Sequence, residues 1–158
     1  MDTGDFDEEA FFRAIASSGA RALLIGRRAM AVLALPVLTA DYDFWIAFDD
    51  VELLNAALEP LDFVPNKTPE GARRTGMYAL ENSEHVDVLI ARSIPTVDGV
   101  AVAFEDVWPR RQSVAYASGV EIVLPSLDDL ILTKRFGART RDVADISLLE
   151  ALKRGGPS

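Results

Sequence analysis

The chain has 158 residues, of which 49% are hydrophobic and 26% charged, a composition that excludes an intrinsically disordered protein. Its 25 acidic and 16 basic residues give a formal net charge of −9, which disfavours non-specific nucleic-acid binding because such binding depends on neutralising phosphates. The absence of cysteine from the sequence excludes disulfides and thiolate metal sites. We expect one domain over residues 1–158, with a core over about 20–125 and C-terminal helices over about 126–154.

The apolar stretches of the sequence are too short to cross a membrane. The longest, Ala29–Leu38, is interrupted by Pro36 and falls far short of the ~20 residues that a spanning helix needs. The first residues are acidic, whereas a secretory signal begins basic and continues apolar. We therefore expect a cytoplasmic protein with no membrane partner.

Helices and short strands alternate along the first half of the chain. Acidic residues ahead of an apolar stripe predict a helix, and short apolar or aromatic runs predict buried strands. Helices are expected over residues 5–18, 27–35 and 49–60, and strands over 21–25 and 42–48. Pro36 and Pro60 mark the ends of the second and third helices.

The second half continues the alternation after a stretch that is hard to interpret. Residues 61–84 are interrupted by proline and glycine and predict only a strand over 77–80. Further strands are expected over residues 85–91, 100–104, 113–116 and 120–124, and helices over 126–136 and 140–153. The whole pattern predicts an α/β or α+β domain, with a small mixed sheet flanked by helices.

Three aspartates stand out by their positions in the expected strands. Asp41 and Asp43 flank Tyr42, and alternate residues of a strand point to the same face, so these two carboxylates converge. Asp87 interrupts an apolar strand, where a lone buried carboxylate is costly unless it is paired or bound to a metal. If the two strands are neighbours, three carboxylates meet, and a hard cation such as Mg²⁺ relieves their repulsion.

Each of these residues also has a structural interpretation. Asp41 or Asp43 alone would serve as a turn cap, and Asp87 would pair with an arginine. His85 is expected on the face of its strand opposite Asp87, as a surface or packing residue, which makes a catalytic triad improbable. The set of three acids together with Gly26 favours the functional interpretation.

The order of these motifs resembles the nucleotidyltransferase superfamily of the DNA polymerase β type. The resemblance is carried by a strand that leads into Gly26 and a helix, by Asp41-Tyr42-Asp43, and by the later Val86-Asp87-Val88. Within the superfamily the chain is similar to the minimal and abortive-infection-toxin groups of small prokaryotic proteins. Residues 125–134 and 141–145 are similar to the ending of those proteins.

The resemblance implies transfer of a nucleoside monophosphate from a nucleoside triphosphate to a hydroxyl acceptor. Asp41, Asp43 and Asp87 would be the catalytic residues and the ligands of Mg²⁺ or Mn²⁺. Gly26 would let the backbone approach the triphosphate, and Lys134 and Arg139 would contact its phosphates or its base. Arg27 would either obstruct the phosphate or bind it. The acceptor would be a protein, an RNA or a small molecule, and the setting would be toxin–antitoxin or phage defence, with a protein partner.

The sequence departs from the family pattern at two positions. Arg27 follows Gly26 where the family has Gly or Ser, and Val37 stands where the minimal groups often carry an arginine. These departures favour the alternative, a catalytically weak or inactive binding or regulatory protein of the same fold, such as an antitoxin-like partner. The intact carboxylates favour the enzyme.

Overall fold

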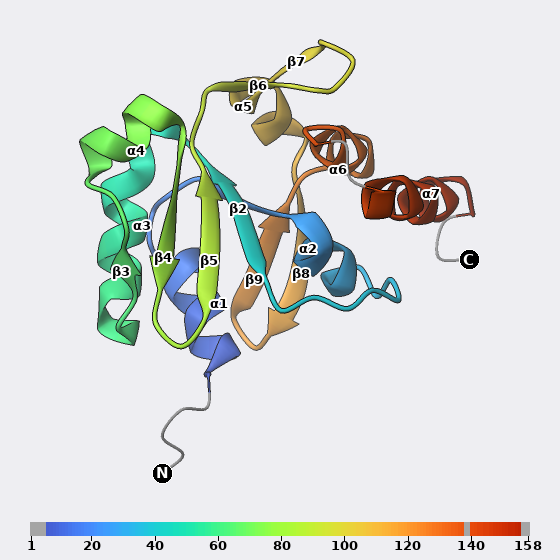
Figure 1. Cartoon of the computed structure of the whole chain (residues 1–158). Helices are drawn as coiled ribbons and strands as arrows, with labels where there is room; N and C mark the ends of the chain where they lie inside the picture. The colour runs from blue at the N-terminus through green and yellow to red at the C-terminus, as the bar shows by residue number, and fades with distance from the viewer. Residues whose placement is uncertain (1–5, 138–139, 156–158) are drawn as a thin grey trace.

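The computed structural model describes residues 6–137 and 140–155 as a mixed α/β structure (Figure 1). The helices are α1 (Glu8–Ala16), α2 (Gly26–Val32), α3 (Val51–Leu58), α4 (Pro69–Thr75), α5 (Phe104–Val107), α6 (Leu127–Lys134) and α7 (Thr140–Gly155). The strands are β1 (Ala22–Ile25), β2 (Tyr42–Ile46), β3 (Val64–Pro65), β4 (Met77–Glu81), β5 (His85–Leu89), β6 (Ser93–Pro95), β7 (Ala101–Ala103), β8 (Gln112–Ala117) and β9 (Val120–Leu124). Short 3₁₀ segments η1, η2 and η3 cover Phe48–Asp50, Glu59–Leu61 and Trp108–Arg110.

Five strands form the main sheet in the order β1-β2-β5-β4-β3. Strand β2 pairs antiparallel with β1 and parallel with β5, and β4 is antiparallel to both β5 and β3. The hairpins β6–β7 and β8–β9 are separate, and β9 lies beside β1 and α1 (Figure 1). The expected mixed sheet flanked by helices is confirmed.

The two faces of the sheet bury different sets of side chains. Tyr42 and Phe44 of β2 and Val88 of β5 belong to the main core, which helices α1 and α3 help to cover. Trp45, one residue further along β2, belongs to a second cluster that contains Leu23, Ile25 and Phe104. Because side chains alternate along a strand, Asp43 lies on the face of the second cluster.

Local signals in the sequence explain where helices α1 and α6 begin. The side chain of Asp7 caps α1 by accepting from the amide of Ala10, and that of Ser126 caps α6 by accepting from Asp129. Helix α2 ends at Val32, earlier than expected, because Ala34 takes a left-handed conformation ahead of Pro36. No helix in the described residues is long and apolar enough to pass through a bilayer.

The stretch over residues 61–84 holds structure that the sequence interpretation missed. Helix α4 begins after Thr68, whose hydroxyl accepts from the amide of Gly71, and Pro69 occupies the first helical turn. These are recognisable start signals for a helix. Strand β3 is only two residues long and lies at the sheet edge, too short to produce an alternating pattern.

Candidate active site

The strand register brings Asp43 and Asp87 together. Strands β2 and β5 run parallel with Asp43 opposite Asp87, and Ile25 of β1 lies opposite Asp43 on its other side. Asp41 precedes Asp43 by two residues, just before β2 begins. The two strands that carry the acids are therefore neighbours, as the expected cluster requires.

A cavity of about 340 Å³ opens over this part of the sheet. Its lining includes all three aspartates, together with Gly26 and Lys134. Helix α7 adds a fourth carboxylate, that of Asp142. The volume lies within the range of about 300–1,000 Å³ that is typical of small-ligand sites.

Gly26 leaves the space that Asp43 uses. Its φ of +72° is a backbone conformation that side chains rarely adopt, and a Cβ there would lie 2.6 Å from Asp43 Oδ2. Any other residue at this position would displace the carboxylate. Glycine is thus required here both by the turn from β1 into α2 and by the close approach of Asp43.

Lys134 and Arg27 converge on Asp145 of α7. Arg27 donates from Nε and from a terminal guanidinium nitrogen to the two oxygens of Asp145, both at 3.0 Å, and Lys134 Nζ donates at 2.8 Å. Lys134 Nζ also lies 3.8 Å from Asp142. Burial alone would raise the pKa of Asp145, but the hydrogen bonds and charges of Arg27 and Lys134 outweigh it and lower that pKa.

His85 is a surface residue, with its side chain 43% exposed, but the expectation that it lies on the face opposite Asp87 is wrong. Residues two apart in a strand share a face, so His85 lies on the same face as Asp87, with Nε2 2.8 Å from Asp87 Oδ1. His85 Nδ1 lies 2.5 Å from Glu81 Oε2 on β4. The hydrogen bonds with Glu81 and then Asp87 raise the pKa of His85, against a smaller opposing effect of burial.

The structure thus gathers most, but not all, of the candidate site residues. Gly26, Asp41, Asp43, Asp87 and Lys134 line one cavity. The guanidinium of Arg27 is instead directed to Asp145 and the carbonyl of Leu38. Arg139 lies outside the described residues.

Two acids of α7 near the site belong to the tail that carries part of the resemblance, but the sequence analysis gave neither of them a role in the site. Asp142 and Asp145 are three residues apart on α7 and are both buried. Buried acids separated by one helical turn indicate a polar contact on the packed face of the helix. This three-residue spacing is the sequence signal that could have predicted a polar contact of α7.

The aspartates offer the right donor atoms for a magnesium ion without forming a closed site. Carboxylate oxygens are the ligands that Mg²⁺ prefers. Within the described residues, no group of three or more His, Cys, Asp or Glu side chains is arranged so that it could hold a metal ion. Two carboxylates ~4 Å apart repel each other by about 4 kcal/mol at an effective dielectric near 20. The carboxylate of Asp87 contacts His85 instead. The donor set fits the ion, and the ion itself would have to draw the carboxylates together.

The fold is that of the nucleotidyltransferases. TM1012 from Thermotoga maritima, assigned as a nucleotidyltransferase, aligns with a TM-score of 0.59 at 13% identity, over 94% of this chain and 89% of its own. The antibiotic-resistance factor ANT(2'')-Ia aligns with a TM-score of 0.62 at 15% identity, over 95% of this chain and 83% of its own. The lincosamide antibiotic adenylyltransferase LnuA aligns with a TM-score of 0.61 at 14% identity, over 94% of this chain and 99% of its own. No protein-family model and no curated relative matches the sequence.

Proposed function

We propose that the chain is a nucleotidyltransferase that moves a nucleoside monophosphate from a nucleoside triphosphate to a hydroxyl acceptor. The observation that carries the proposal is the single cavity lined by Gly26, Asp41, Asp43 and Asp87. The adenylyltransferase LnuA, a neighbour in fold, supports this reaction class.

The residues divide the work of the reaction. Asp41 and Asp43 would share two divalent cations, and Asp87 would hold one of them; when bound, these ions supply charge neutralisation between acids and phosphates. Gly26 lines the cavity, where its backbone would face the phosphates, and Lys134 offers a positive charge at the cavity wall.

In the reaction, the acceptor oxygen forms a bond to the α-phosphorus while the bond from that phosphorus to the β-phosphate bridging oxygen breaks. Pyrophosphate leaves with that oxygen. The proton of the hydroxyl passes to the carboxylate of Asp87.

A transfer assay tests this proposal. The purified protein is incubated with each α-³²P-labelled triphosphate, Mg²⁺ and a crude cell extract as the source of acceptors. We expect labelled product that is lost in Asp43→Asn and kept in Asp49→Asn, which changes an aspartate whose side chain is 82% exposed. Absence of transfer to any acceptor contradicts the proposed activity.

One observation favours the alternative, a binding or regulatory protein of this fold. Two of the three cations predicted to contact the triphosphate, Arg27 and Lys134, are bound to Asp145. Triphosphate binding in an equilibrium titration, together with no label transfer, would support this second function.

A further inference from the structure

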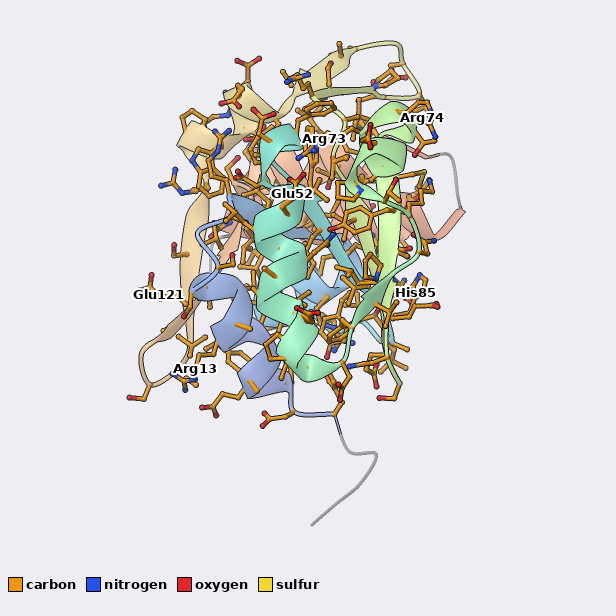
Figure 2. All side chains as sticks on the ribbon, turned by 90° about the vertical axis from the view of Figure 1, so that its left-hand side faces the viewer. Arg13, Glu52, Arg73, Arg74, His85 and Glu121 are labelled. Carbon is orange, nitrogen blue, oxygen red and sulfur yellow. The ribbon has the colours of Figure 1, made fainter. Side chains whose placement is uncertain are left out.

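Hydrogen bonds connect the cavity, through Asp87 and His85, to Glu81 at the end of strand β4. Glu81 lies opposite His85 in the β4–β5 register, and Asp87 follows His85 on the same face. The imidazole contacts both carboxylates, at 2.5 Å to Glu81 and 2.8 Å to Asp87. His85 is labelled in Figure 2 beside these strands.

The β4–β5 register places this imidazole between two carboxylates. Glu81 and Asp87 are the charged groups that contact the ring. The imidazole connects to the cavity through Asp87, and Asp41 lines the same cavity.

The two contacts allow His85 to restrain the carboxylate of Asp87. A carboxylate accepts hydrogen bonds, so a ring that is protonated on both nitrogens donates from Nε2 to Asp87 and from Nδ1 to Glu81. The side chain of Asp87 is 51% exposed, and such a side chain exchanges between rotamers unless it is held. The bond to Oδ1 restrains the carboxylate and leaves Oδ2 without a contact to His85.

We propose that His85, itself oriented by Glu81, is a positioning residue that holds Asp87 for nucleotidyl transfer. The inference rests on the proposed function of the cavity. Groups that orient a ligand from outside the coordination shell contribute about 10- to 100-fold in metal affinity or activity. We expect an effect of this size from loss of the Nε2 donor.

Substitution of His85 tests the inference through a donor and a non-donor. His85→Phe keeps a ring without donors, and His85→Gln keeps an amide N–H that reaches Asp87. We expect His85→Phe to lower kcat and Mn²⁺ affinity by about 10- to 100-fold, with the KM for triphosphate unchanged, and His85→Gln to restore most of both. Glu52→Gln is the control, because it breaks an ion pair outside the cavity, between Glu52 on α3 and Arg73 on α4 (Figure 2).

The chain's single histidine also provides a readout that does not depend on activity. The ring signals of His85 are unique in an NMR spectrum because the sequence holds one histidine. We expect Mn²⁺ alone to broaden them in the parent protein and much less in Asp87→Asn.

The outcomes separate the two proposals. If the parent transfers label and Mn²⁺ broadens the His85 signals, but His85→Phe keeps the parental kcat and Mn²⁺ affinity, the positioning role is overturned and the activity stands. Equal impairment of His85→Gln and His85→Phe overturns it as well. No transfer and no broadening in the parent removes the proposed function and with it the role of His85.

Discussion

Removal of the Asp145 carboxylate should destabilise the protein strongly. This side chain is 1% exposed and accepts three hydrogen bonds, two from Arg27 and one from Lys134. Asp145→Ala removes the nearer of two carboxylates beside the Lys134 ammonium, which is 6% exposed, and Asp142 remains 3.8 Å away. Loss of one partner of a buried ion pair costs about 3–5 kcal/mol, which for a domain of this size lowers Tm by about 6–20 °C.

Thermal and urea unfolding of three variants measures this effect. Arg27→Gln should cost less than Asp145→Ala, because Lys134 still neutralises the carboxylate and Arg27 is 26% exposed. The double variant Asp145→Ala/Lys134→Met should recover part of the loss, since the buried ammonium is then removed together with the carboxylate nearest to it. A loss below about 1 kcal/mol in Asp145→Ala, the range of exposed ion pairs, would refute the assignment of a buried ionic centre.

The same ion cluster predicts an acid limit to stability. Because the pKa of Asp145 is lowered in the folded protein, its contribution is present above the ordinary aspartate pKa and is lost as pH falls through the folded-state pKa. The stability difference between the parent and Asp145→Asn should therefore shrink toward low pH. A difference that is independent of pH would contradict the ionised state of Asp145.

Three further outcomes are expected. Gly26→Ala should destabilise the protein more than Gly119→Ala, and it should also reduce the stabilisation by divalent cations. Both glycines have positive φ, but the added Cβ meets Asp43 only at Gly26, whereas at Gly119 nothing lies within 4 Å. Equal losses would show that the contact with Asp43 is unimportant. If a divalent cation binds the folded chain with a Kd of ~1 mM, 10 mM Mg²⁺ or Mn²⁺ should add about 1.4 kcal/mol of stability, which raises Tm by roughly 3–6 °C. Asp41→Asn should remove most of this rise in Tm when melting scans are matched for ionic strength. Because the pKa of His85 is raised in the folded protein, its stabilising contribution should be full below about pH 6.5 and lost as pH rises through the folded-state pKa; a parent-minus-His85→Gln difference in Tm that grows with pH would contradict this.

Local physics in the sequence accounts for the individual elements and for part of the site. Short apolar runs become β1 and β2 because they suit strands buried on both faces, whereas β5 buries Val86 and Val88 and leaves Asp87 exposed between them. Ser126 starts α6 because its hydroxyl accepts from an amide that has no partner within the helix. The two-residue period of a strand aligns Asp41 with Asp43 from sequence alone. The same period also places His85 beside Asp87, so that contact was predictable and was misjudged.

Only the tertiary structure decided which distant residues meet. The parallel register that sets Asp87 opposite Asp43 depends on how two strands, more than forty positions apart in the chain, bury their apolar faces together. The bond of Arg27 to Asp145, across 118 positions, arises because α7 packs its buried acids near α2 and α6. Local propensity contains no information on such pairings, since they follow from the burial of charge among elements that the chain brings together only on folding.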